Sequence, residues 1–114
     1  RIELHIEGAP SADLPEETAL TCFRVLQEAL TNVLKHAAAH HVQVRLRFTE
    51  ESVWLEVRDD GVGLAASAPP AGGMGLFGMR ERARALGGSL FIEGQPGSGT
   101  AVRCQIPLAA RRSA

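Results

Sequence analysis

Several features that would point to other classes of protein are scarce in this sequence. Its 114 residues include no tyrosine, one tryptophan and four phenylalanines, too few for an aromatic platform on which nucleic-acid bases could stack. The formal net charge is −1, without the basic excess that a dedicated nucleic-acid binder needs. The longest apolar stretches fall far short of a membrane span. We therefore expect neither nucleic acid nor the interior of a bilayer as a partner.

Cysteine is also scarce, and its placement argues against a disulfide framework. Cys22 lies in a helical pattern and Cys104 in a strand pattern, without CxxC spacing. Two such residues are typical of buried, reduced thiols in a cytosolic protein. The sequence has no signal peptide and does not begin with methionine. It opens directly in a strand-like pattern, so we expect a cytoplasmic domain of a longer protein.

The apolar pattern, by contrast, is strong enough to outline a fold. Apolar residues make up 45% of the chain, which is typical of one soluble globular domain spanning residues 1–114. Alternation of apolar and polar residues predicts strands at 2–7, 42–48 and 53–57. Residues 89–93 and 100–106 are read as two further strands. Helical periodicity covers about 16–38 and 76–86. Residues 64–73 are read as a mobile loop and 109–114 as a frayed tail.

The order of these elements predicts the fold class. It runs strand, helix, two strands, loop, helix and two strands, and each strand has one apolar face. The short link 49–52 predicts a hairpin between the second and third strands. We expect a two-layer α/β sandwich, with a mixed, mostly antiparallel sheet covered on one face by the helices.

A polar stripe interrupts the first predicted helix. Glu28 and Asn32 are four residues apart, and Lys35 and His36 follow at three and four, so these side chains share one helical face. Asn32 offers a neutral oxygen to a hard cation such as Mg²⁺, and Glu28 could help ligate it through water or act as a base. Lys35 could meet a phosphate as a point charge. An ordinary solvated helix face remains the alternative.

A carboxylate followed by two glycines comes directly after the third predicted strand. Asp59 could accept a hydrogen bond from an exocyclic amine such as that of adenine. Gly61 and Gly63 would let the backbone turn sharply and approach a flat ligand. The same residue types also form ordinary turns at strand ends, so this motif alone leaves both interpretations open.

A second glycine-rich segment, 72–78, precedes the second predicted helix. Free amides at a helix start suit a phosphate, whereas a flexible linker that ends in a cap would have a similar composition. The segment is not a Walker loop, because Gly-Lys-Ser/Thr is absent, and its spacing does not fit a dinucleotide fingerprint.

The histidines near the end of the first predicted helix raise the question of zinc. His36 and His40 have the four-residue spacing that zinc favours, but no third ligand is evident. We interpret His36 as a helix-end residue near the negative end of the dipole, and His40 and His41 as solvent-facing linker residues.

These segments, in this order, resemble the ATP-binding catalytic domain of bacterial sensor histidine kinases, in the GHKL superfamily that includes DNA gyrase, the ninety-kilodalton heat-shock chaperone and MutL. Residues 24–37 resemble the N box of the nitrate/nitrite-sensor-like subgroup, and 59–63 and 73–82 resemble the two glycine boxes. Asp60 stands where many relatives have Asn, and no phenylalanine-containing F box is evident. The resemblance covers nearly the whole chain and implies a Bergerat-type ATP-binding fold.

The resemblance assigns roles to individual residues. It implies that Asp59 bonds the adenine amine, supported by Thr100. Asn32 and Glu28 become the catalytic pair, with Asn32 a ligand of Mg²⁺ and Glu28 orienting the metal shell or polarising water. Residues 64–74 become the ATP lid. The implied ATP-binding set is Asn32, Lys35, His36, Asp59, Gly61, Gly63, Gly73, Gly75, Leu76 and Thr100.

The implied activity is transfer of the γ-phosphoryl group of ATP, with Mg²⁺, to a histidine on a dimerisation domain that this chain lacks. A response regulator would then receive the group on an aspartate. We expect the full-length protein to be a homodimer and this domain alone a monomer. Three alternatives stay open: a related ATPase of the superfamily, an anti-sigma-factor serine kinase, and a degenerate nucleotide-binding module.

Overall fold

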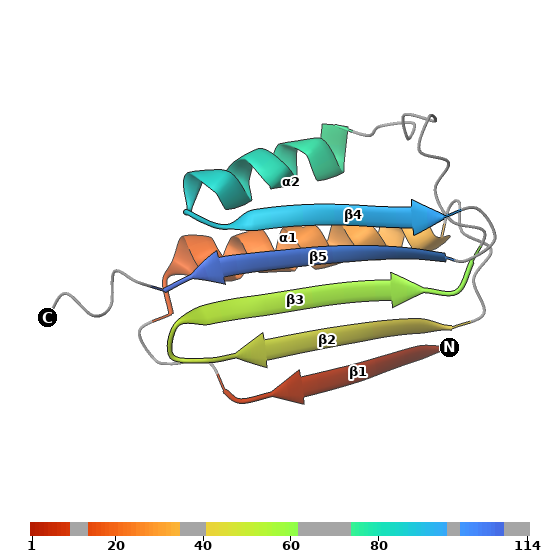
Figure 1. Ribbon diagram of the computed structural model, residues 1–114, viewed down its shortest axis with the longest axis horizontal. Coiled ribbons are helices and arrows are strands. Elements are labelled where there is room, and N and C mark those ends of the chain that lie inside the picture. Colours follow the sequence, from red (N-terminus) through yellow and green to blue (C-terminus); the bar gives the residue numbers. More distant parts are fainter. Residues whose placement is uncertain (10–13, 35–40, 62–73, 96–98, 109–114) are drawn as a thin grey trace, which may run out of the picture.

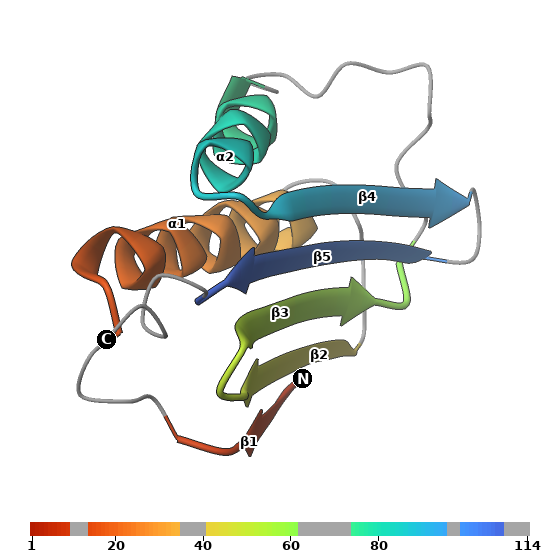
Figure 2. The same cartoon turned by 60° about the vertical axis from the view of Figure 1, so that its left-hand side comes forward.

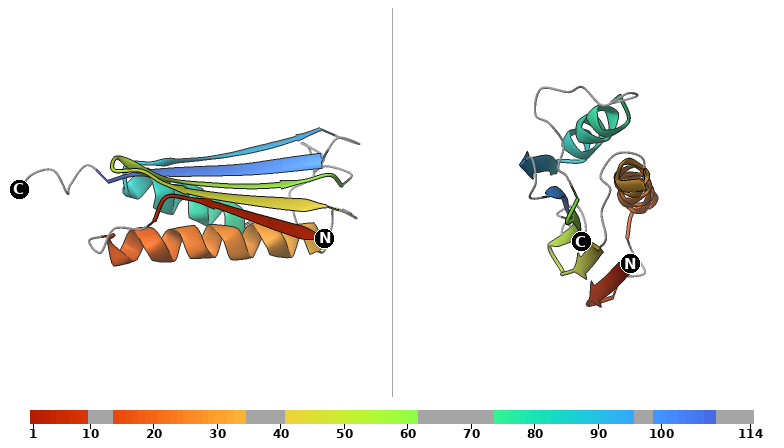
Figure 3. Two further views of the ribbon diagram at one scale, coloured as in Figure 1. Left: turned by 90° about the horizontal axis from the view of Figure 1, so that it is seen from below. Right: turned by 90° about the vertical axis from the view of Figure 1, so that its right-hand side faces the viewer.

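The computed structural model describes residues 1–9, 14–34, 41–61, 74–95 and 99–108. Its elements are, in order, β1 (Ile2–Glu7), α1 (Glu16–Asn32), β2 (Val42–Phe48), β3 (Ser52–Asp59), α2 (Met74–Ala85), β4 (Ser89–Gln95) and β5 (Gly99–Pro107). The strands form one sheet of order β1-β2-β3-β5-β4, and both helices lie on one face of it (Figures 1 and 3). The predicted two-layer α/β sandwich is confirmed.

The sheet is mixed, as predicted, because β1 runs parallel to β2 and the other pairs are antiparallel. The expected hairpin joins β2 to β3. There the Thr49 hydroxyl oxygen accepts hydrogen bonds from the amides of Glu51 (3.1 Å) and Ser52 (2.9 Å). A threonine that satisfies turn amides in this way fixes the register of the two strands.

The core lies between the sheet and the helices. Alternate residues of the central strands point inward, and Val53, Val57 and Ile106 are almost fully buried. On α1 the buried positions recur every three or four residues, which brings Thr18, Thr21, Val25 and Ala29 onto one face. Full burial of a valine or isoleucine side chain, such as Val25, Val53, Val57 or Ile106, stabilises the fold by about 1.5–3 kcal/mol.

The second helix differs at its start from the sequence prediction, and the end of the first helix is described only in part. The apolar pattern predicted the first helix to about residue 38. The α-helix α1 runs to Asn32 and passes into a wider helical turn at residues 33–34. Residues 35–40 lie outside the described residues. The second helix begins two residues earlier than predicted, at Met74. It ends as predicted at two glycines: Gly87 has a φ of +83°, and the Gly88 amide donates to the Ala83 carbonyl (2.7 Å).

The alternation of apolar and polar residues in 2–7 predicted a half-buried strand, and this expectation is wrong. Ile2, Leu4 and Ile6 are 61%, 61% and 56% exposed. They face the same side of the sheet as the inward residues of β2, but α1 packs against β3, β5 and α2, while α2 packs against β4 and β5. Figure 2 shows β1 at the edge of the sheet furthest from α2. The alternation therefore predicted the existence of the strand correctly. It did not predict whether another element covers the apolar face of that strand.

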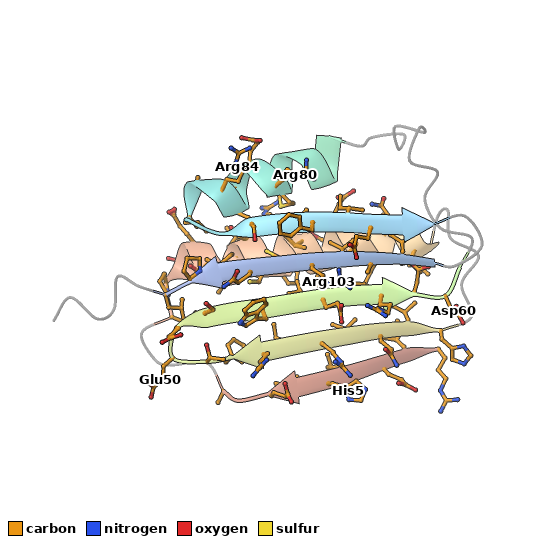
Figure 4. The ribbon with its side chains drawn as sticks, viewed as in Figure 1. His5, Glu50, Asp60, Arg80, Arg84 and Arg103 are labelled. Atoms are coloured by element: carbon orange, nitrogen blue, oxygen red, sulfur yellow. The ribbon has the colours of Figure 1, made fainter. Side chains whose placement is uncertain are left out.

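The outer face of the sheet carries a network of ion pairs beside two exposed aromatic side chains, Trp54 and Phe91. Arg103 lies near its centre (Figure 4) and donates from Nε to Glu56 (2.8 Å) and from its terminal nitrogen to Glu93. The Glu93 and Glu56 carboxylates raise the pKa of Arg103 through these hydrogen bonds. No helix in the described part of the chain is long and apolar enough to span a membrane.

Candidate functional site

The described segments that carry the predicted site residues lie together at one end of the two-layer sandwich. At this end β3 terminates, β5 begins, α1 terminates and α2 begins (Figure 1). Asp59 is the last residue of β3, Thr100 the second of β5 and Asn32 the last of α1. Residues far apart in the sequence are therefore brought to the same end of the fold.

Asp59 is a buried carboxylate at the end of a central strand. Its side chain continues the inward series of β3 and the residue is only 6% exposed. The Gly61 amide donates to Asp59 Oδ1 at 2.8 Å, which partly offsets the cost of burying the charge. A carboxylate can accept several hydrogen bonds, so Asp59 retains capacity for a donor on a ligand. Thr100, also buried, is its direct cross-strand neighbour on β5.

The backbone of β5 comes unusually close to Asp59. Gly99 has a φ of +92°, and a Cβ built there would lie 2.0 Å from the Asp59 carbonyl oxygen. Any side chain at this position would displace one strand from the other. Gly99 lies between the predicted strands 89–93 and 100–106, and the sequence prediction did not include this contact. The signal was present in the glycine that directly precedes the strand and Thr100.

A second contact that the sequence interpretation missed lies on the β2 side. The His41 amide donates to Asp60 Oδ1 (2.9 Å), and His41 Nδ1 lies 3.0 Å from Asp60 Oδ2. The Asp60 amide in turn donates to the His41 carbonyl oxygen (3.2 Å). His41 is exposed, as expected, but it is not an idle linker residue. Figure 4 shows Asp60 just beyond the end of β3.

Glu28 and Asn32 occupy the last two turns of α1. Both are half-buried, and neither side chain forms a hydrogen bond or ion pair with any residue in the described ranges. Their oxygens are of the kind that Mg²⁺ takes together with water and phosphate ligands. No cluster of three or more His, Cys, Asp or Glu occurs among the described residues. The carboxylate and carboxamide oxygens of Glu28 and Asn32 therefore fit the protein part of a Mg²⁺ coordination shell.

The remaining predicted site residues are less fully described. Gly75 and Leu76 lie in the first turn of α2, but nothing is described of their side chains. Lys35, His36, Gly63 and Gly73 lie outside the described residues, as do residues 64–73 of the predicted lid. Their assignments stay predictions from the sequence.

The two cysteines take no part in this end of the molecule. Both are free thiols within or against the core, as predicted. Burial raises the pKa of Cys22 to about 11. Burial, and secondarily the neighbouring Cys22, raises the pKa of Cys104 to about 12. Thiols with such values are almost fully protonated at neutral pH and are poor nucleophiles.

Comparison with known sequences adds independent information. A family model described as histidine kinase-, DNA gyrase B-, and HSP90-like ATPase matches residues 17–110. The oxygen sensor histidine kinase NreB of Staphylococcus carnosus is 42% identical over 93 residues, which are 81% of this chain and 27% of that protein. The histidine-protein kinase/phosphatase DegS of Brevibacillus brevis is 37% identical over 94 residues, 82% of this chain and 24% of that protein. The chain thus spans about a quarter of the length of these relatives.

Solved structures agree with the sequence matches. The histidine kinase domain of the blue-light activated kinase of Erythrobacter litoralis EL346 superposes with a TM-score of 0.70 at 32% identity, covering 95% of this chain and 55% of that one. The Acinetobacter baumannii histidine kinase AdeS superposes with a TM-score of 0.72 at 21% identity, covering 94% of this chain and 53% of that one, and supports the fold alone.

Proposed function

The chain belongs to the histidine kinase-, DNA gyrase B- and HSP90-like ATPase family, and we propose that it is the ATP-binding catalytic domain of a two-component sensor histidine kinase. The observation that carries the proposal is a buried carboxylate, Asp59, at the same end of the fold as Asn32 and Glu28, whose side-chain oxygens have no hydrogen-bond partner among the described residues. The kinase names of both curated relatives support the choice within the family.

The proposed base site centres on Asp59. One of its oxygens holds the Gly61 amide, and the carboxylate still has capacity for a donor such as the exocyclic amine of adenine. Guanine presents a carbonyl oxygen at the corresponding position and would face the carboxylate with another acceptor. Asp59 therefore selects adenine over guanine, and Thr100 supports this contact from β5.

The proposed phosphate site is formed by the ends of the two helices. Asn32 would hold Mg²⁺ through its amide oxygen, and Glu28 would orient the surrounding water. When bound, the metal neutralises phosphate charge. The first turn of α2, with Gly75 and Leu76, presents amides that are free of helical partners and favour an anion. Lys35 and His36 follow Asn32 in sequence and are proposed to contact phosphate as well.

The proposed reaction transfers the γ-phosphoryl group of ATP to a histidine on a separate dimerisation domain. The bond from the γ-phosphorus to the bridging oxygen breaks, ADP leaves, and a phosphorus–nitrogen bond forms on the acceptor imidazole. The protein contributes position and charge neutralisation, as is general for phosphoryl transfer. An aspartate of a response regulator would then accept the group. We place the domain in the cytoplasm, as part of a homodimeric parent protein.

The test combines this chain, the dimerisation domain of the same protein and radiolabelled Mg²⁺-ATP. Acid-labile, base-stable label on a histidine of the added domain supports the kinase, and Asn32→Ala should abolish it. Free phosphate without the added domain would instead indicate an ATPase with Glu28 as base. Label on serine would indicate a serine kinase, and binding without any transfer a nucleotide-binding module.

A further inference from the structure

We propose that His41 and Asp60 form a clamp that positions Asp59 for the adenine base. This inference rests on the proposed function, because it assigns a role within the same nucleotide site. The clamp consists of the contacts that join the residue before β2 to the residue after β3. His41 and Asp60 are positioning residues and act through Asp59.

The clamp continues the pairing of β2 and β3 one step past the last strand pair. Val42 and Asp59 are the final cross-strand partners of the two strands. Beyond them, strand ends normally fray, because no further backbone partner fixes the chain. Here the Asp60 amide donates to the His41 carbonyl at 3.2 Å, and the His41 amide donates to the Asp60 carboxylate at 2.9 Å. The peptide that links Asp59 to Asp60 is therefore tied to β2.

The other side of Asp59 is held by β5. Gly99 approaches the Asp59 carbonyl so closely that no Cβ could be accommodated there. Asp59 thus lies between a close backbone contact on β5 and the clamp on β2. Because hydrogen bonds weaken steeply with distance and angle, a small shift of this strand end would misalign its carboxylate with an adenine amine.

The two adjacent carboxylates have different tasks in this arrangement. Both oxygens of Asp60 are engaged by His41, one by the backbone amide and one by the ring. Asp59 has one oxygen on the Gly61 amide and is buried, whereas Asp60 is exposed. Asp59 therefore meets the ligand, and Asp60 fixes the chain on which Asp59 is carried.

The clamp lies at the surface, with side-chain exposures of 58% for His41 and 47% for Asp60. Ion pairs of this kind add little to global stability. Loss of the clamp should therefore change nucleotide affinity while leaving the melting temperature almost unchanged. That combination separates a positioning role from a merely structural one.

The experiment measures Mg²⁺-ATP affinity by calorimetry or NMR titration in four variants. Asp60→Ala should weaken binding about three- to tenfold, the range expected for lost hydrogen bonds. Asp60→Asn should stay within about twofold, because a carboxamide can accept from the His41 amide and donate to the neutral ring. His41→Ala keeps the backbone contacts and should give an intermediate loss. Glu50→Ala removes an exposed carboxylate from the opposite end of the sheet (Figure 4) and should change nothing.

A double-mutant cycle with Asp59→Asn makes the test specific. If the clamp acts through Asp59, adding Asp60→Ala to Asp59→Asn should cause no further loss of affinity. An equal loss in both backgrounds, or wild-type affinity in folded Asp60→Ala, would overturn the clamp. Failure of the proposed nucleotide site is distinguishable, since the unmodified chain would then not bind Mg²⁺-ATP at all. Failure of the proposed kinase activity alone would appear only in the transfer assay and would leave the affinities of these variants unchanged.

Discussion

At the scale of single residues, the proposal of nucleotide binding depends on the carboxylate of Asp59 and the carboxamide of Asn32. The two groups are proposed to act on different parts of the ligand. Asp59 is buried and already holds one backbone amide, so it is preorganised as an acceptor. Asn32 is half-buried and unengaged by described residues, so it is available to a cation. Substitutions at these two positions should consequently have different effects on base selectivity and on metal dependence.

Replacement of Asp59 by Asn should remove most of the preference for adenine over guanine nucleotides. The carboxamide keeps the shape but loses the charge of the acceptor, and a hydrogen bond to a charged group is worth about 1.5–3 kcal/mol. Calorimetric titration of the folded variant with ATP and GTP measures this difference. Unchanged ATP affinity would remove Asp59 from the base site.

Replacement of Asn32 by Ala should weaken Mg²⁺-ATP binding more than binding of metal-free ATP. The reason is that the amide oxygen is proposed to reach the nucleotide only through the metal. Parallel titrations with Mg²⁺ and with EDTA give the two affinities. Equal losses under both conditions would count against Asn32 as a ligand.

The buried thiols provide a prediction that does not depend on nucleotide. In the folded state the pKa values of Cys22 and Cys104 are raised to about 11 and 12. Between the ordinary thiol range and these values the folded chain holds more protons than the unfolded chain. Their contribution to stability is therefore complete below about pH 8.5 and is lost as the pH rises through 11 and 12. The free energy of unfolding, measured by denaturation from pH 8 to 11, should fall as the pH rises. In Cys22→Ala this fall should be smaller.

At the scale of the elements, the sequence predicted the strands well because alternation with a period of two is a local property. It could not predict what covers β1, since that depends on where the helices come to lie over the assembled sheet. The predicted continuation of the first helix to about residue 38 is tested only as far as Leu34, because residues 35–40 lie outside the described residues. Local patterns predicted the existence of each element, whereas tertiary packing determined its burial.

The candidate site shows the same division. Asp59 follows the inward series of β3, so its orientation was predictable from the alternation. The contact of Asp60 with His41 and that of Gly99 with Asp59 were not predictable from the sequence. Strand pairing brings these residues together although they are 19 and 40 residues apart, respectively, along the chain. A glycine directly before the last predicted strand indicates a close backbone approach, but without the pairing register the sequence does not show which residue it meets.

The exposed apolar row of β1 makes a prediction about the elements. In this 114-residue chain, Leu4→Thr should change the free energy of unfolding by no more than about 0.5 kcal/mol, because the side chain is 61% exposed. Val44, its partner on β2, is 3% exposed. Val44→Thr buries an additional hydroxyl and should cost about 1–3 kcal/mol. Urea denaturation of both variants checks the contrast, and similar losses would mean that β1 is covered.

At the scale of the whole molecule, the site lies where four elements meet, so a bound nucleotide should stabilise the entire fold and not only one loop. A ligand at one hundred times its dissociation constant adds about 2.7 kcal/mol to the free energy of unfolding. For a domain of this size the melting temperature should rise on the order of 10 °C. Scanning calorimetry with and without Mg²⁺-ATP measures the shift.

Two variants serve as controls at the same ATP concentration. The melting temperature of Asp59→Asn should rise much less. Glu50→Ala should behave like the unmodified chain, because Glu50 lies at the other end of the sheet (Figure 4). An equal rise in all three proteins would mean that ATP stabilises the fold from a different surface.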